Sequence, residues 1–329
     1  MKNKVKAAIR NPQSPIQGVS YTKLSGTGND FVLVDTLHTQ TGRAHVSWPR
    51  IAQRLCNRSQ GIGADGLLVL GRSRVADVRM RIFNPDGSEP DMCGNGLRCL
   101  AWYATRSGQA REGGTLTIQT KAGIKQATFD SPNHVRVDLG VPRFIRHFHR
   151  FVVEGRRVFH MDVVNSGVFH VVCWVSDVSR IDVRKLGRYL RNHPRFRPQG
   201  ANVDFVEWVS MTQPARPFGN ERPYRIRLKM RTYERGVEAE TRACGTGAVA
   251  SAAAAIHHAL SRETQRTSSD MHRPFAVEVS VPGGVLRVNL EAKSHCLRQK
   301  QKWNLGHAWL EGKITRLDRG VFTFANGRE

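Results

Sequence analysis

The sequence predicts an α/β fold of the α+β type, with two pseudo-symmetric domains that each curl a mixed sheet around a central helix. Two short segments are near copies, MCGNGLRCLAWYA at 92–104 and ACGTGAVASAAAA at 243–255. Both run from Cys-Gly-polar-Gly into a helix-forming apolar stretch. The stretch after the second copy is apolar on nearly all sides, so we expect a sheet to wrap it. The two helices are expected to begin at the seam between the domains.

The first half of the chain alternates predicted strands with short helices. Residues 19–36 have the pattern of a strand, a Gly-rich turn and a second strand, and 49–56 have helical periodicity. Apolar runs or alternation predict further strands at 63–72, 77–84, 115–123 and 135–140. The helix that begins at Cys93 lies in the middle of this set.

The second half repeats the plan. Strands are predicted within 151–167, 169–175, 201–209 and 224–234, an amphipathic helix at 181–193, and a hairpin at 276–292. The hairpin is expected to turn at Pro282, Gly283 and Gly284, and 261–274 is expected to be a polar loop. We expect a basic flexible tail at 1–18, a first domain at 19–133 that also takes 313–329, and a second at 134–312.

Composition excludes several classes of protein. The chain has 329 residues, 40% apolar, and lacks the run of about 18 apolar residues that a membrane span needs. Six cysteines without CxxC pairs, and no secretion signal, predict free thiols in the cytoplasm. The net charge of +24 is spread along the chain without a nucleic-acid-binding motif, so no specific nucleic-acid partner is expected. We assign no role to this positive charge or to the basic segment at 293–309.

The two duplicated cysteines, Cys93 and Cys244, are the candidate catalytic groups. Backbone N–H groups and the helix dipole at a helix start favour thiolate over thiol. Two such groups that face each other can remove a proton from one side of a carbon and return one to the other. The other cysteines are expected to be inert: Cys56, Cys99, Cys173 and Cys296. No spacing of ligands indicates a metal site, and no cofactor is expected.

The chain closely resembles the diaminopimelate epimerases, the cofactor-independent amino-acid epimerases of lysine and peptidoglycan synthesis. The resemblance spans about 20–290, and the matching blocks occur in the family's order: SGTGNDFVLVD, GIGADGLLVL, FNPDGSEPDMCGNGLRC, NSGVFHVV, GANVDFVE and YERGVEAETRACGTGA. It implies two pseudo-symmetric domains with the active site between them. It also implies that one of Cys93 and Cys244 acts as thiolate base and the other as thiol acid.

The resemblance assigns further positions. Backbone N–H groups at Gly94, Asn95, Gly245 and Thr246 would hold the α-carboxylate and take up its developing charge. The other substrate-binding positions are Asn29, Asn84, Asn202, Glu234 and Arg235.

Arg235 is expected to fork onto the distal carboxylate of the substrate, and Glu234 and His170 to tune the two cysteines. The chain departs from the family at Gly66, where some members carry a glutamine. It departs again at Val168 and Phe169, where many members carry Asn-Pro or Val-Pro before the histidine. A lost side-chain contact at Gly66 or Val168 could weaken substrate binding.

Two other functions stay open. The same fold serves racemases or epimerases of proline, hydroxyproline or histidine, but an arginine at position 235 has a use only if the substrate carries a distal carboxylate. A basic binding protein on an epimerase scaffold need not keep both cysteines. We also expect a small amino-acid substrate, a homodimer and no membrane partner.

Overall fold

The computed structural model describes residues 18–38, 47–109, 114–131, 134–153, 157–213, 223–261, 272–297 and 300–324. The expected basic tail, except for residue 18, lies outside the described residues, as does most of the expected loop at 261–274. Side chains of the basic segment at 293–309 are described only at 293, 294 and 303–309.

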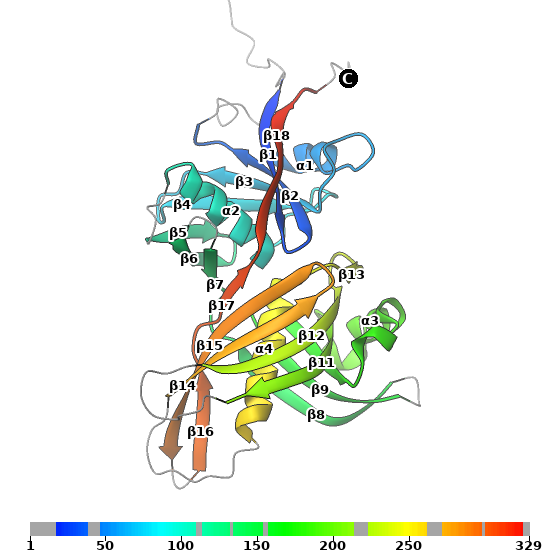
Figure 1. The fold of residues 1–329 in the computed structure, drawn as a ribbon. Coiled ribbons are helices and arrows are strands. Elements are labelled where there is room, and N and C mark those ends of the chain that lie inside the picture. Colours follow the sequence, from blue (N-terminus) through cyan, green and yellow to red (C-terminus); the bar gives the residue numbers. More distant parts are fainter. Residues whose placement is uncertain are drawn as a thin grey trace, which may run out of the picture.

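The fold is a mixed α/β fold, as predicted. In the described ranges, eighteen strands are joined into one sheet by parallel and antiparallel pairings, with few helices. Figure 1 shows two groups of strands, one around α2 and one around α4, and the chain crosses between them near β7 and β17.

The first group contains α1 (Trp48–Leu55) and α2 (Gly94–Arg106). Its strands are β1 (Val19–Gly26), β2 (Asn29–Asp35), β3 (Gly66–Gly71), β4 (Val78–Phe83), β5 (Thr115–Thr120), β6 (Gly123–Ser131), β7 (His134–Asp138) and β18 (Ile314–Phe322). The last strand, β18, pairs antiparallel with the first, β1, so the end of the described chain lies beside its beginning.

The second group contains α3 (Val183–Arg191), α4 (Gly245–Ser261) and two short 3-10 turns, Val178–Arg180 and Pro194–Phe196. Its strands are β8 (Arg143–Val153), β9 (Arg157–Asn165), β10 (Phe169–Val175), β11 (Asn202–Thr212), β12 (Tyr224–Glu234), β13 (Ala239–Thr241), β14 (His272–Val281), β15 (Gly284–Leu297), β16 (Lys300–Leu305) and β17 (Trp309–Gly312).

Each cysteine-led helix is enclosed by the strands of its own group. α4 contacts β9, β10, β11, β12, β14 and β15, and all its residues from Gly247 to Ile256 are buried, as its uniform apolarity predicted. α2 contacts β1, β2, β3, β4, β7 and β18. Across the two groups, α2 and α4 also contact each other directly.

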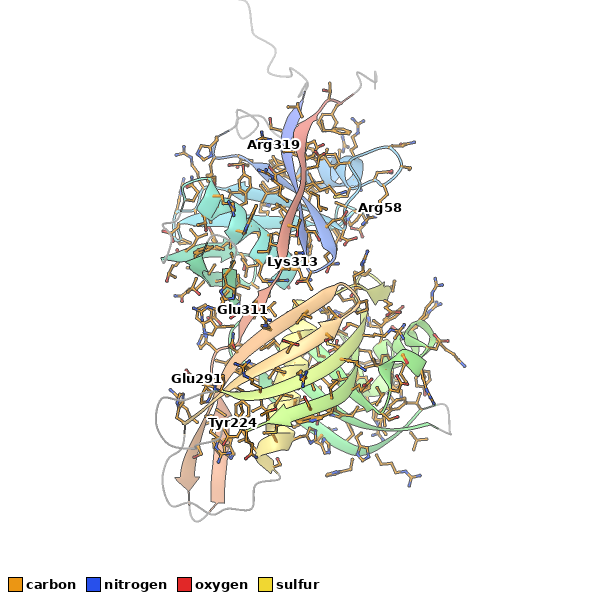
Figure 2. The ribbon with its side chains drawn as sticks, in the orientation of Figure 1. Arg58, Tyr224, Glu291, Glu311, Lys313 and Arg319 are labelled. Carbon is orange, nitrogen blue, oxygen red and sulfur yellow. The ribbon has the colours of Figure 1, made fainter. Side chains whose placement is uncertain are left out.

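The link between the groups is β17, which pairs with β7 on one side and β15 on the other. Glu311 strengthens it: one carboxylate oxygen lies 3.0 Å from His134 Nε2, and the other accepts a 2.6 Å hydrogen bond from Asn289. Figure 2 shows Glu311 where the chain passes between the groups. The expected domain boundary falls between β6 and β7. These two strands pair with each other, so hydrogen bonds of the sheet cross the boundary. The division into domains stays a prediction.

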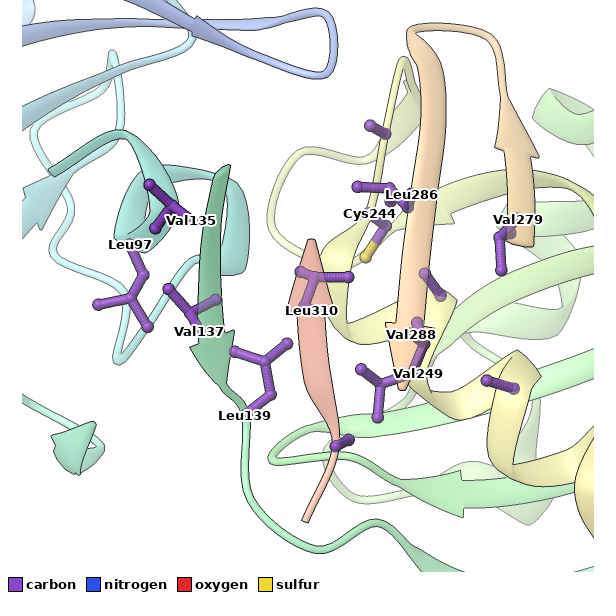
Figure 3. Close-up of a cluster of buried hydrophobic side chains, with 14 of the residues drawn as sticks. Leu97, Val135, Val137, Leu139, Cys244, Val249, Val279, Leu286, Val288 and Leu310 are labelled. Carbon is purple, nitrogen blue, oxygen red and sulfur yellow. The ribbon is translucent and has the colours of Figure 1, made fainter. Parts of the chain in front are cut away.

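Leu310 fills the core at this junction. Its side chain lies between Val137 and Leu139 on one side and Leu286 and Cys244 on the other (Figure 3). It is fully buried, so both groups of strands contribute to one continuous hydrophobic core.

Several element ends differ from those predicted. The hairpin turns where expected, but β14 begins at His272, inside the expected polar loop, because its backbone pairs with β15 as far as Lys293. β8 begins at Arg143 because the backbone pairs with β9 from Asn165 onward, despite the dense positive charge of this segment. Ladder hydrogen bonds there outweigh unfavourable composition.

Candidate active site

The starts of α2 and α4 lie against each other. Cys93 is the N-cap of α2, and Cys244 directly precedes α4. A Cβ atom built on Gly245 would lie 3.5 Å from the Gly94 Cα atom and 2.8 Å from Leu310 Cδ2. Glycine at both positions therefore allows the two backbones to approach this closely. The fold brings both predicted cysteines, with their following N–H groups, to one place at the junction of the two groups.

Both thiols accept a hydrogen bond from the first turn of their own helix. Gly96 N lies 3.5 Å from Cys93 Sγ, and Gly247 N lies 3.4 Å from Cys244 Sγ. Such bonds favour the thiolate, as the sequence predicted. Burial is the larger effect: it raises the pKa of Cys93 to about 11 despite the bond from Gly96.

The pKa of Cys244 is raised well above its usual value, first by burial and then by the nearby charges of Glu234 and Asp204. Burial therefore outweighs the helix starts in the resting protein. Both groups are thiols at neutral pH, and forming a thiolate requires a neighbouring base or a change on substrate binding.

Glu234 is one such base beside Cys244. Burial raises the pKa of this carboxyl, although hydrogen bonds with Thr241 and Cys244 act in the opposite direction. A carboxylate with a raised pKa is a better proton acceptor than an exposed one. Glu234 is the last residue of β12, and a tight turn through Arg235 and Gly236 follows it, closed by a 2.9 Å hydrogen bond from Glu238 N to the Glu234 carbonyl.

A second route from Cys244 runs through Thr246 to His170. Thr246 Oγ1 lies 3.5 Å from Cys244 Sγ and 3.0 Å from His170 Nε2. The other ring nitrogen, Nδ1, lies 2.7 Å from an oxygen of Asp204, which also accepts a 2.7 Å hydrogen bond from Thr232. His170 and Asp204 are both fully buried. The His170 ring therefore bridges the Asp204 carboxylate, at Nδ1, and the Thr246 hydroxyl, at Nε2.

The asparagines take up different positions. Asn95 Nδ2 donates to Asn29 Oδ1 at 2.8 Å and to the Ala243 carbonyl at 3.1 Å, which ties α2 to the residue before Cys244. Asn29 in turn donates to Asp65 at 3.0 Å. Asn95 and Asn29 therefore lie beside the cysteine pair, and their contact with substrate stays a prediction.

Asn202 and Arg235 lie together on the side of His170. Asn202 Oδ1 accepts a 2.7 Å hydrogen bond from the Arg235 backbone N–H, and its Nδ2 lies 3.4 Å from His170 Nε2. The Arg235 guanidinium donates to the Gln199 carbonyl at 3.3 Å. Asn84 is different, because its side chain donates to Ser88 within its own turn.

Sequence reasoning missed two buried residues that contact this candidate site. Asp204, which holds His170, is hidden in the alternation of a strand, where its only signal is an acidic residue between apolar neighbours. Arg98 lies one turn into α2 with 0% exposure, and donates to Asn95 Oδ1 at 2.5 Å and to Thr27 Oγ1 at 3.1 Å. Its signal was a lone arginine among the apolar residues that follow Cys93.

The two departures from the family pattern have different consequences. At Gly66 a Cβ atom would lie 3.1 Å from the Phe83 carbonyl oxygen, so this backbone leaves little room for a longer side chain. The Val168 carbonyl accepts from Ser166 N at 3.1 Å, and the Ser166 hydroxyl donates to the Thr246 carbonyl at 2.9 Å. The backbone of this loop is therefore attached to the start of α4 without the usual proline.

The remaining expected site features are placed as follows. Cys56, Cys99 and Cys173 are buried free thiols whose pKa is raised mainly by burial, as expected of inert core cysteines. The Cys296 side chain is outside the described residues. In the described ranges, every helix is too short or too polar to cross a membrane.

Comparison with known proteins identifies the family. The family model for diaminopimelate epimerase matches residues 21–145 and 163–308. The chain belongs to the diaminopimelate epimerase family. Members of this family are isomerases.

Similar proteins are found across archaea and bacteria. The diaminopimelate epimerase of Methanothrix thermoacetophila is 37% identical over 316 residues, which cover 92% of this chain and 95% of that protein. That of Desulforudis audaxviator is 38% identical over 285 residues, covering 82% and 91%.

Solved structures share the fold at low sequence identity. A hydroxyproline epimerase from Agrobacterium vitis has a TM-score of 0.62 at 15% identity, covering 94% of this chain and 93% of that one. A phenazine biosynthesis protein of the PhzF family from Bacillus anthracis has a TM-score of 0.60 at 16% identity, covering 93% and 98%.

Proposed function

We propose that this chain interconverts LL- and meso-diaminopimelate for lysine and peptidoglycan synthesis, and that Cys93 and Cys244 exchange the α-proton. The observation that carries the proposal is the contact between two cysteine-led helix starts at Gly94 and Gly245. A thiolate takes one proton from the carbon, and a thiol gives another to the opposite face, so the two cysteines exchange roles and the reaction balances without electron transfer to a cofactor.

The substrate α-carboxylate would bind at the paired helix starts. Four backbone N–H groups, at Gly94, Asn95, Gly245 and Thr246, are the donors closest to the two cysteines in sequence. They would accept the negative charge that moves onto this carboxylate as the α-proton leaves. In the direction where Cys244 is the base, its proton would pass to Glu234, or to His170 through the Thr246 hydroxyl.

Arg235 would select the distal carboxylate. In the described structure it forms no ion pair, and its guanidinium donates only to a backbone carbonyl, so a carboxylate could replace this partner. Asn202, which binds the Arg235 backbone, and Asn84 would complete this end of the site. A racemase of proline or histidine is the alternative, supported by the fold it would share, and it would leave Arg235 without a use.

The test is solvent deuterium incorporation at Cα and epimerisation of LL-diaminopimelate. Cys93→Ala and Cys244→Ala should each abolish epimerisation, because each removes the proton-transfer group on one face. Cys99→Ala, a buried thiol on the same helix as Cys93, is the matched control and should stay near wild type. Near-wild-type turnover in either single active-site variant would disprove the two-thiol mechanism.

Arg235→Lys separates the two substrate classes. A charge-assisted bidentate contact contributes about 1.5–3 kcal/mol, or roughly ten- to a hundredfold in kcat/KM, and lysine cannot reproduce the fork. Turnover of proline or histidine equal to that of diaminopimelate would favour the alternative. A cytoplasmic location and a homodimer, without nucleic-acid or membrane partners, remain part of the proposal.

A further inference from the structure

Three potential metal ligands meet at the end of α4 away from the cysteines. His147 comes from β8, Asp162 from β9 and His258 from the last turn of α4, and their ligand atoms all lie within 4.8 Å of one another. Cys244 is at the opposite end of the same helix, so this cluster is separate from the site described above. The sequence indicated no metal site because the three residues are far apart along the chain.

Asp162 is the centre of the cluster. It has 0% exposure, and its two oxygens are shared: Oδ1 lies 2.5 Å from His147 Nδ1 and Oδ2 lies 2.7 Å from His258 Nε2. A buried carboxylate therefore faces two imidazoles, one at each oxygen.

Further hydrogen bonds fix the orientation of two of the three groups. Trp174 Nε1 donates to Asp162 Oδ2 at 2.6 Å, and His147 Nε2 lies 3.1 Å from His149 Nδ1. Metal-binding imidazoles and carboxylates commonly have such outer partners, which set the ring tautomer and the direction of the ligand atom. The β8–β9 register places His147 directly opposite Asp162, so the backbone supports the same geometry.

The site is also accessible and suits a cation. The His147 and His258 side chains are 20% and 27% exposed, so an ion can enter from solvent while Asp162 stays buried. Ligand atoms around a tetrahedral zinc ion are about 3.3 Å apart, given metal–ligand distances of about 2.0–2.1 Å. His258 lies in the last turn of α4, where the carbonyl ends of the helix favour positive charge.

We propose that His147, Asp162 and His258 bind one Zn²⁺ ion, with water as the fourth ligand, and that this ion fastens the β8–β9 hairpin to the C-terminal turn of α4. Two imidazoles and a carboxylate are a donor set that zinc accepts. The ion would be structural, because the site lies at the other end of the helix from the cysteines. The proposal is independent of the proposed epimerase activity.

The test uses the full chain, without a histidine tag and treated with a chelator, in a Cys93→Ala/Cys244→Ala background that removes the active-site thiols as zinc ligands. Titration with ZnCl₂ against a competing chromophoric chelator should give one zinc per chain, and zinc should raise Tm by several degrees. Asp162→Asn and His258→Gln should each weaken zinc binding by a hundredfold or more. His257→Gln, which changes the adjacent histidine on the same helix, should leave zinc affinity unchanged.

Binding of zinc that is equally strong in His258→Gln would overturn the proposal, as would the absence of binding to the parent chain. In either case the cluster is a hydrogen-bonded His–Asp–His group only. If the Asp162→Asn chain does not fold, His258→Gln decides the result, since this partly exposed side chain can be replaced without leaving an uncompensated buried charge. Anomalous scattering at the zinc edge should then place the ion between the three side chains.

Discussion

Arg98 offers a sharp test of how this site controls its cysteines. Its guanidinium is fully buried, its Nε and Nη1 have no hydrogen-bond partner, and no carboxylate in the described structure pairs with it. Burial lowers the pKa of Arg98 to about 10, so it remains charged at neutral pH. An unpaired buried charge costs several kcal/mol, and its use here would be to stabilise the Cys93 thiolate, whose pKa it lowers.

The substitution Arg98→Met separates stability from activity. It removes two hydrogen bonds to a charged group, worth about 1.5–3 kcal/mol each, and it also removes a desolvation cost of several kcal/mol. The two effects are of similar size, so the free energy of unfolding should stay within about 2 kcal/mol of wild type. Activity should fall because loss of the positive charge raises the Cys93 pKa. Each pKa unit lowers the thiolate population about tenfold, which corresponds to about 1.36 kcal/mol.

The assays are denaturant unfolding, kcat/KM for LL-diaminopimelate and the pH dependence of Cys93 alkylation. We expect roughly tenfold or greater loss of kcat/KM and an alkylation profile displaced to higher pH. Arg106→Met, at the exposed end of the same helix, is the control and should change neither. Strong destabilisation with full activity and an unchanged alkylation profile would show that Arg98 is purely structural and refute the reasoning.

Two further predictions concern Cys93 and the glycines that follow the two cysteines, Gly94 and Gly245. Since the Cys93 pKa is about 11, the thiol is protonated below that pH, and its alkylation by iodoacetamide should accelerate about tenfold per pH unit from 7 to 10; peptide mass spectrometry showing a plateau near pH 8 would contradict this. Gly245→Ala would bring a Cβ atom to 2.8 Å from buried Leu310, against 3.3 Å for Gly94→Ala. The first should therefore cost about 1–3 kcal/mol in denaturant unfolding and reduce kcat/KM more than the second, and equal effects would count against the close contact of the helix starts.

Local patterns in the sequence determined much of this protein. The strand–turn–strand pattern of β1 and β2, the hairpin at Gly283 and the uniform apolarity of α4 each depend on residues close together in the chain, and the structure agrees with them. The duplicated Cys-Gly-polar-Gly segment identified both cysteine-led helices for the same reason, because an N-cap and its first turn are contiguous.

Only the tertiary structure decided the electrostatics of the site. Whether a helix-start cysteine is thiol or thiolate depends on how much water the rest of the fold removes from it, and burial outweighs the helix start at Cys93. The partners of His170 depend likewise on residues brought together from distant strands and helices, and so does the burial of Arg98 Nε and Nη1 without a hydrogen-bond partner. Burial and long-range pairing are properties of the packed chain, and no local window of sequence contains them.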